Sequence, residues 1–319
     1  MKRFKNILLI FDPNAKTQSA IDHATSLAKS NAAHITILSV IKHLPSDLSM
    51  AITAISPQEL LALVIKERQE QVDALVADMI RQDVNASSKV VSGTPFLEII
   101  RQVLREQHDL VIIAAEGKGG LSDRLFGSTS MHLMRKCPCP VWVVKPTRRK
   151  TYERILAAVD TTNDFPDPEQ DSLNPLILQL ASSMAKMDKG ELHVIQAWSV
   201  YGEGYMSVRG GISEDAIKKL RKLAKQEYTG LVDRLLAGID VEGVPVYKHL
   251  PRSMEIAKTI TTLAKNKKID LLVMGTVCRS GIAGFLIGNT AEKVLNKVDC
   301  SVLTVKPEGF VSPVTLEDE

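Results

Sequence analysis

Short apolar runs alternate along the chain with longer stretches in which apolar residues recur every three or four positions. The runs at 6–11 and 34–40 are short and nearly continuous, which is typical of strands buried on both faces. Between them, Ala20, Ala24 and Leu27 form the one-sided stripe of an amphipathic helix. This alternation continues through the chain and predicts parallel sheets with helices on both faces.

Several of the predicted helices have clear start signals. Ser56 is followed by Pro57 and Glu59, which matches a capping serine, a proline at the first helical position and a capping-box glutamate. Thr94 and Pro95 predict a second helix start of the same kind. Ser213 is predicted to cap a third helix, whose buried face would hold Ile217, Leu220 and Ala224.

The first half of the chain is repeated in the second. The matching pairs are 4–14 with 152–162, 108–115 with 269–276, and 139–146 with 300–307. In the first pair, the apolar strand ends in an aspartate in both copies, Asp12 and Asp160. A gene duplication therefore explains the length of 319 residues, which suits two domains of about 150 residues each.

The repeat sets the predicted domain boundaries. We expect a first domain at 1–147, a second at 152–308 and a short acidic tail at 309–319. Each domain is predicted to be a sandwich around a five-stranded parallel sheet. The acidic, proline-containing stretch 161–175 has no counterpart in the first half and is interpreted as an inserted loop.

The candidate chemistry lies where strands end, because open parallel sheets bind ligands beyond the carboxyl ends of their strands. Each half has an aspartate after its first strand and a loop after its fourth strand that closes at a helix start. That start is Gly127-Ser128-Thr129 in the first half and Gly288-Asn289-Thr290 in the second, where Asn289 with Glu292 indicates a variant capping box. Each loop is either a phosphate site at a helix N-terminus or an ordinary glycine turn with a helix cap.

The spacing of these loops is more specific. The first half has Ala114, two residues, Gly117, nine residues and then Gly127-Ser128. The second half has Gly275, two residues, Cys278, nine residues and then Gly288-Asn289. This plan resembles the universal stress protein family, whose motif is glycine, two residues, glycine, nine residues and glycine with serine or threonine. The resemblance covers nearly the whole chain, twice.

The resemblance implies two tandem flavodoxin-like (adenine nucleotide alpha-hydrolase-like) three-layer sandwiches, each with strand order 3-2-1-4-5. It implies ATP or ADP, with Mg²⁺, as the ligand to look for. By the same resemblance, the nucleotide-binding residues of the first domain are Asp12, Val40, Ala114, Gly117, Gly127, Ser128 and Thr129. The ligand-binding residues of the second domain are Asp160, Ala197, Gly275, Cys278, Gly288, Asn289 and Thr290.

Departures from the family motif limit what can be carried over. Cys278 replaces a glycine, which alone adopts positive φ at little cost, and Glu116 places a negative charge near any bound phosphate. We therefore predict at most one weak nucleotide site, in the first domain. Cys278 itself is either a redox sensor or a small residue that fills the loop.

Composition and motifs exclude several classes of function. Aromatic residues make up 4% of the chain and the net charge is +3, which argues against a nucleic-acid partner. No apolar stretch is long enough to span a membrane, and no P-loop motif occurs. The four cysteines form no C-x-x-C pair and no zinc spacing, so we expect a reducing cytoplasm. His108, at a strand start, is interpreted as a capping or surface residue.

Three classes of function remain. The first is a non-enzymatic stress-response protein that acts through a small ligand and unknown protein partners, with no catalytic residue and no metal ligand. The second is a slow metal-dependent ATP hydrolase. The third is a binder of a larger apolar or lipid-like ligand in the second domain, shaped in part by 199–211.

The last strand of each half suggests how the domains associate. The segments "VWVVK" and "VLTVK" are apolar on both faces and are expected at sheet edges, where an uncovered strand is a pairing hazard. We therefore predict that they pair within one chain, as an intramolecular pseudo-dimer.

Overall fold

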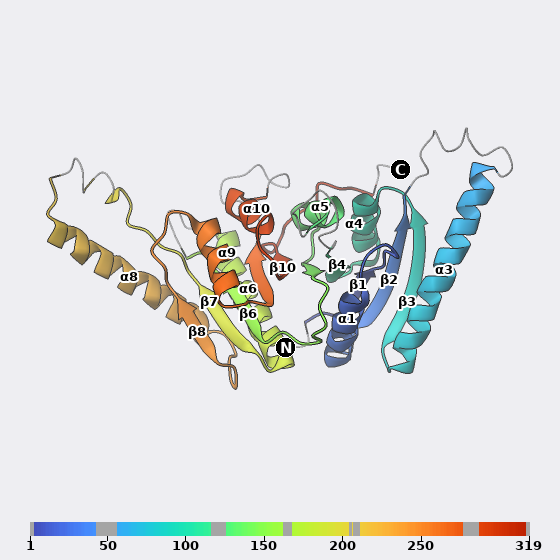
Figure 1. The fold of residues 1–319 in the computed structure, drawn as a ribbon, viewed down its shortest axis with the longest axis horizontal. Coiled ribbons are helices and arrows are strands. Elements are labelled where there is room, and N and C mark those ends of the chain that lie inside the picture. The colour runs from blue at the N-terminus through green and yellow to red at the C-terminus, as the bar shows by residue number, and fades with distance from the viewer. Residues whose placement is uncertain are drawn as a thin grey trace. The chain divides into compact units, whose positions relative to one another are not determined.

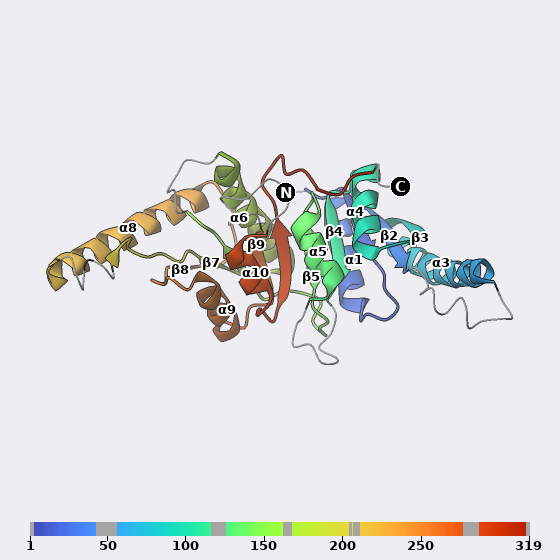
Figure 2. The same cartoon turned by 90° about the horizontal axis from the view of Figure 1, so that it is seen from above.

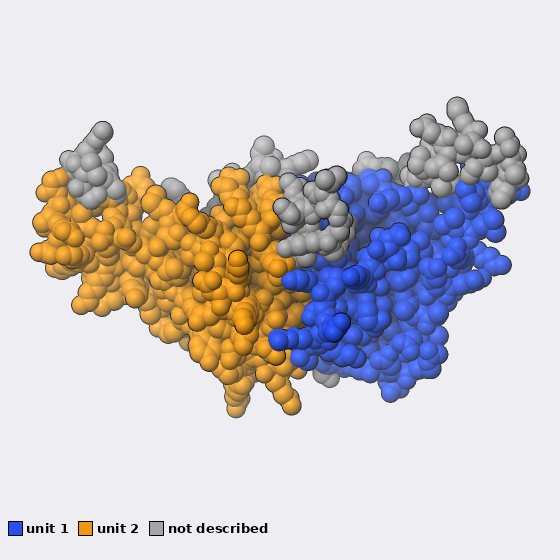
Figure 3. Space-filling model, viewed as in Figure 1, with its two compact units in different colours: residues 1–151, 281–286, 310–319 blue, residues 152–280, 287–309 orange. Residues whose placement is uncertain are grey.

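The computed structural model describes residues 3–42, 56–115, 126–161, 168–203, 206, 211–276 and 287–316, without the side chains of 168–171. The chain divides into two compact units, shown in Figure 3. The first comprises residues 1–151, 281–286 and 310–319, and the second comprises residues 152–280 and 287–309. The domain boundaries predicted from the repeat stay a prediction.

The first unit contains a parallel sheet in the order β3-β2-β1-β4-β5 (Figure 1). Its strands are β1 (Asn6–Ile10), β2 (His34–Ile41), β3 (Asn85–Ser92), β4 (Leu110–Ala114) and β5 (Val141–Val144). Its helices are α1 (Gln18–Asn31), α3 (Pro57–Arg81), α4 (Pro95–Glu106) and α5 (Ser128–Lys136). Helices lie on both faces of the sheet, as Figure 2 shows for α1 and α4.

The second unit repeats this order as β8-β7-β6-β9-β10, again with all strands parallel. Its strands are β6 (Arg154–Ala158), β7 (Glu191–Ile195), β8 (Val246–His249), β9 (Leu271–Gly275) and β10 (Ser301–Val305). Its helices are α6 (Pro168–Asp188), α8 (Glu214–Ala237), α9 (Ile256–Asn266) and α10 (Asn289–Leu295). The predicted fold class, two tandem three-layer sandwiches with five-stranded parallel sheets, is confirmed.

The helix starts were well predicted from local chemistry. The Glu59 N–H donates to Ser56 Oγ over 3.2 Å, and the Ser56 N–H donates to Glu59 Oε2 over 2.9 Å, so the capping box is formed. Ser213 also caps its helix, by accepting a hydrogen bond from the Ala216 N–H at 3.3 Å. The buried face of that helix was predicted less well, because Leu220 is 38% exposed. Only Ile217 and Val232 of α8 are buried, so the helix packs along a narrower stripe than its sequence suggests.

The interpretation of 161–175 as a loop was wrong for its second half. Helix α6 begins at Pro168 and has Pro175 within it. A proline at the first helical position costs nothing, because its missing N–H has no acceptor there anyway. Beyond Pro175 the helix buries the predicted residues Ile177, Leu180, Ala181 and Met184.

Replacing Gly230 with alanine is expected to stabilise the second unit by roughly 0.5–1 kcal/mol. Gly230 lies within α8, where an added Cβ would meet only Arg234 Nη1, at 3.5 Å. Urea unfolding followed by the fluorescence of Trp198 measures the change. Gly190→Ala is the control and should destabilise, because its Cβ would lie 2.5 Å from the Tyr152 carbonyl oxygen. A loss of stability in Gly230→Ala would contradict the packing of α8.

Candidate functional site

A cavity of about 240 Å³ opens in the first unit at the carboxyl ends of β1, β2 and β4. Four of the predicted residues line it: Asp12 after β1, Val40 near the end of β2, Ala114 at the end of β4 and Thr129 in the first turn of α5. The sheet order explains this meeting, because the chain reverses its winding direction between β1 and β4. That these residues bind a ligand stays a prediction.

The loop after β1 holds Asp12 in a tight turn. Its Oδ1 accepts a hydrogen bond from the Asn14 N–H at 2.9 Å, and its carbonyl oxygen accepts one from the Ala15 N–H at 3.0 Å. Asp12 is exposed at the edge of the cavity. Its carboxylate can therefore accept hydrogen bonds from hydroxyl groups of a ligand.

Helix α5 presents its N-terminus beside the cavity. Gly127 is the N-cap, with φ −74° and ψ 174°, and Ser128 is the first helical residue. No side chain of the described residues caps the helix, so the Ser128 hydroxyl does not serve as the cap. The first N–H groups of a helix have no acceptor within it and carry the positive end of its dipole. This end of the cavity is therefore suited to an anion.

Sequence reasoning missed two basic residues of the cavity, Lys42 and Arg68. Arg68 Nη1 donates to Ser39 Oγ over 2.8 Å, and Ser39 Oγ donates to the Phe11 carbonyl oxygen over 2.9 Å. Arg68 lies in the middle of α3, and nothing in the sequence distinguishes it from the other charged residues on the solvent-exposed face of that helix. It adds positive charge to the wall formed by the ends of β1 and β2.

A side chain lies over the corresponding strand end in the second unit. Gly275 is the counterpart of Ala114 in the repeat, and a Cβ added to it would lie 2.7 Å from Leu173 Cδ2. Leu173 belongs to α6, the helix that begins within the inserted stretch. The insertion therefore places an apolar side chain above the end of β9.

The loop after β6 is also tied to α6. The Asp160 N–H donates to Asn174 Oδ1 over 3.0 Å, and Asn174 Nδ2 donates to the Asp160 carbonyl oxygen over 2.7 Å. The Thr161 N–H donates to Gln196 Oε1 over 2.8 Å, and Gln196 Nε2 in turn donates to the carbonyl oxygen of Ala197. The backbone of the predicted residue Asp160 is thus bonded to Asn174, and that of Ala197 to Gln196, while Asp160 itself is exposed.

The capping box predicted at Asn289 is wrong. Gly288 is the N-cap of α10, with φ −60° and ψ 140°, and Asn289 is already helical, followed by Thr290. Asn289 stands one position too late to cap, because only the N-cap residue has the extended backbone that capping requires. The Gly288 N–H donates instead to the Thr276 carbonyl oxygen over 2.9 Å. Gly117, Cys278 and Glu116 lie outside the described residues.

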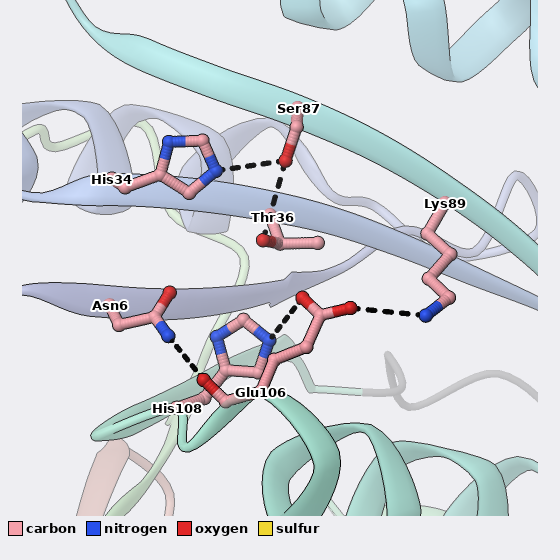
Figure 4. A network of polar contacts seen from close by, with 7 residues as sticks. All are labelled: Asn6, His34, Thr36, Ser87, Lys89, Glu106 and His108. Carbon is pink, nitrogen blue, oxygen red and sulfur yellow. Dashed lines mark hydrogen bonds and ion pairs between the residues drawn. The ribbon is translucent and has the colours of Figure 1, made fainter.

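His108 is not a surface residue, as the sequence suggested, but is 3% exposed. It lies in a polar network at the amino ends of the strands of the first unit (Figure 4). Its Nε2 lies 3.6 Å from Glu106 Oε2, and Glu106 Oε1 lies 3.1 Å from Lys89 Nζ. Asn6 Nδ2 donates to the Glu106 carbonyl oxygen over 2.7 Å. Burial lowers the pKa of His108, which favours the neutral imidazole. Through Asn6 and Lys89, the network joins α4 to β1 and β3.

Within the described ranges, no group of three or more histidine, cysteine, aspartate or glutamate side chains is placed to hold a metal ion. No helix in the same ranges is long and apolar enough to cross a bilayer.

Comparison with known proteins gives consistent results over the whole chain. The model of the universal stress protein family matches residues 3–145 and again residues 151–306. Universal stress protein E of Escherichia coli strain K12 is 29% identical over 328 residues, which cover 100% of this chain and 99% of that protein. The universal stress protein E homolog of Haemophilus influenzae is 25% identical over 323 residues, covering 96% and 98%.

Solved structures show the same fold. A functionally unknown protein from Pseudomonas aeruginosa PAO1 has a TM-score of 0.66 at 24% identity, over 96% of this chain and 94% of that one. A universal stress protein from Archaeoglobus fulgidus has a TM-score of 0.63 at 18% identity, over 96% and 98%.

Proposed function

The chain belongs to the universal stress protein family as a tandem member, and on this premise we propose that its first domain binds an adenine nucleotide weakly and acts as a stress-response protein through ligand and partner binding. The family resemblance found in the sequence is confirmed. The nucleotide, its site and the partners are the proposed part.

The cavity of the first unit is the observation that supports this proposal. It combines three features that a nucleotide needs. Thr129 and the N-terminus of α5 suit a phosphate group, and Asp12 suits the hydroxyls of a ribose. Val40, Pro95 and Ile99 offer apolar surface for a base.

The same cavity favours binding over catalysis. Hydrolysis of ATP needs a group that positions the attacking water and a site for the metal. Among the described residues that line the cavity, Asp12 is the one carboxylate, and no histidine is present. Mg²⁺ that arrives with ATP or ADP would be held mainly by the phosphates, as is usual for this ion.

The second domain is proposed to contribute little to nucleotide binding. Leu173 fills the space above Gly275, and the Asp160 backbone is bonded to Asn174. Whether this domain takes a larger apolar ligand stays a prediction, as do the pairing of the last strands and the cytoplasmic location.

Replacing Asp12 with asparagine is expected to weaken ATP and ADP binding about tenfold, which corresponds to about 1.4 kcal/mol. The amide keeps an oxygen that can accept the Asn14 N–H, so the turn should persist while the charged acceptor is lost. Isothermal titration of the full chain measures the affinity.

Asp160→Asn is the matched control, because Asp160 holds the same place in the repeat. It should leave the affinity unchanged. Equal losses in both variants would show two working sites, and an unchanged affinity in Asp12→Asn would place the nucleotide elsewhere.

A further inference from the structure

Two cysteines meet at the end of helix α5. Cys137 is the C-cap residue of the helix, and its N–H donates to the Leu133 carbonyl oxygen over 2.9 Å. Cys139 follows two residues later, just before β5. The two Sγ atoms lie 3.5 Å apart, and neither forms a disulfide.

The backbone holds this arrangement in place. The chain bends at Pro138 and Cys139, and Pro140 follows directly. Proline fixes φ, so the Cys-Pro-Cys-Pro segment loses little conformational freedom when its thiols approach. A disulfide needs the sulfur atoms at about 2.05 Å, so the 3.5 Å contact has to close by only about 1.5 Å. Two atoms at about this separation are already close enough to react without a large rearrangement of the chain.

The two thiols differ in access. Cys137 is 0% exposed, whereas Cys139 is half-buried. An oxidant in solution therefore reaches Cys139 first, and Cys137 is placed to react with the product. This is the arrangement of an attacking thiol with an adjacent resolving thiol.

We propose that Cys137 and Cys139 form a reversible disulfide when the protein meets hydrogen peroxide. The Cys139 thiolate attacks one peroxide oxygen, the O–O bond breaks, and the leaving hydroxide takes up a proton to become water. Cys139 is now a sulfenic acid. The Cys137 thiolate then attacks the Cys139 sulfur, the S–O bond breaks, and the second hydroxide leaves as water. Overall, two thiols and one peroxide give one disulfide and two waters, and a dithiol reductant reverses the change.

The repeat provides an internal control for this chemistry. Cys300 stands in the second unit where Cys139 stands in the first, but Val298 replaces the partner Cys137. Cys300 is also 4% exposed. It should therefore neither react quickly nor gain a disulfide partner within its own segment.

The pair is also connected to the cavity through α5. This helix has nine residues, with Gly127 before its first turn and Cys137 at its last. Closing the disulfide changes the end of a helix whose other end faces the proposed phosphate position. The disulfide itself does not depend on the proposed nucleotide site.

The test is peroxide treatment of the purified full chain, followed by denaturation, alkylation of remaining thiols and mass spectrometry of the peptides. The peptide that carries both cysteines should lose two hydrogens, about 2 Da, and resist alkylation, and dithiothreitol should restore both thiols. Cys139→Ser should abolish this disulfide, while Cys300→Ser should leave it unchanged. Alkylation of both thiols after treatment, or conversion of Cys139 only to sulfinic or sulfonic acid, would overturn the proposal.

Discussion

Replacing Asp109 with alanine is expected to lower the free energy of unfolding of the first unit by about 3 kcal/mol. Asp109 stands just before β4, and its Oδ2 accepts hydrogen bonds from the N–H groups of Lys5 and Asn6, at 2.5 and 3.1 Å. The carboxylate thus joins the starts of two neighbouring central strands. Its removal leaves two backbone donors without their acceptor, at roughly 1–3 kcal/mol each before water compensates.

The chain contains two tryptophans, one in each unit, so the loss of stability in each unit can be measured separately by fluorescence. In a Trp198→Phe background, the fluorescence of Trp142 follows urea unfolding of the first unit. The matched variant is Asp270→Ala, whose Oδ2 accepts from the N–H groups of Glu153 and Arg154, both at 3.0 Å. In a Trp142→Phe background it should cost the second unit a similar amount, read from Trp198. A loss below about 0.5 kcal/mol in both variants would show that water replaces the carboxylate.

Acidification from pH 7 to pH 4 is expected to destabilise the wild-type first unit by about 3 kcal/mol more than it destabilises His23→Gln. Burial lowers the pKa of His23 from 6.5 to about 4, against the opposing effect of Asp22. Between pH 6.5 and about pH 4, His23 therefore binds a proton in the unfolded chain but not in the folded chain. The stability that the neutral, buried His23 contributes is fully present above pH 6.5 and is lost as the pH falls to 4.

The fluorescence of Trp142 reports on the same group, because its ring centroid lies 5.3 Å from that of His23. Urea midpoints at several pH values, in the Trp198→Phe background, give the difference between wild type and variant. Burial also lowers the pKa of His108, so the variant should keep part of the pH dependence. Identical pH profiles for wild type and His23→Gln would contradict the prediction.

The elements of the fold follow from local chemistry. A capping serine such as Ser56 and a proline such as Pro95 act on the turn they begin, and the helices start there. Continuous apolar runs such as β1 and β4 have one stable environment, a sheet covered on both faces. Prediction failed where a segment had two allowed states, as at α6, whose proline can begin a helix or stand in a loop.

The candidate site was only partly predictable. Asp12, Val40, Ala114 and Thr129 lie at strand ends or a helix start, and the resemblance to the family pointed to them. Arg68 enters the cavity from the middle of α3, and its place depends on the packing of that helix against β2. The burial of His108 likewise depends on α4 and β3, which lie next to it only after folding.

The duplication, the alternation of strand and helix and the family were determined by the sequence alone, because each depends only on the order and short-range spacing of residues. Only the tertiary structure decided what lies beyond the carboxyl ends of the strands in the described part of each copy. In the first unit Asp12, Val40, Ala114 and Thr129 line a cavity, and in the second Leu173 lies against Gly275. The contact between Cys137 and Cys139 was decided in the same way, by a backbone bend that spacing alone does not reveal. Both contacts depend on the volume of side chains and the direction of the backbone in the folded chain. A duplicated domain can keep the fold without keeping such contacts.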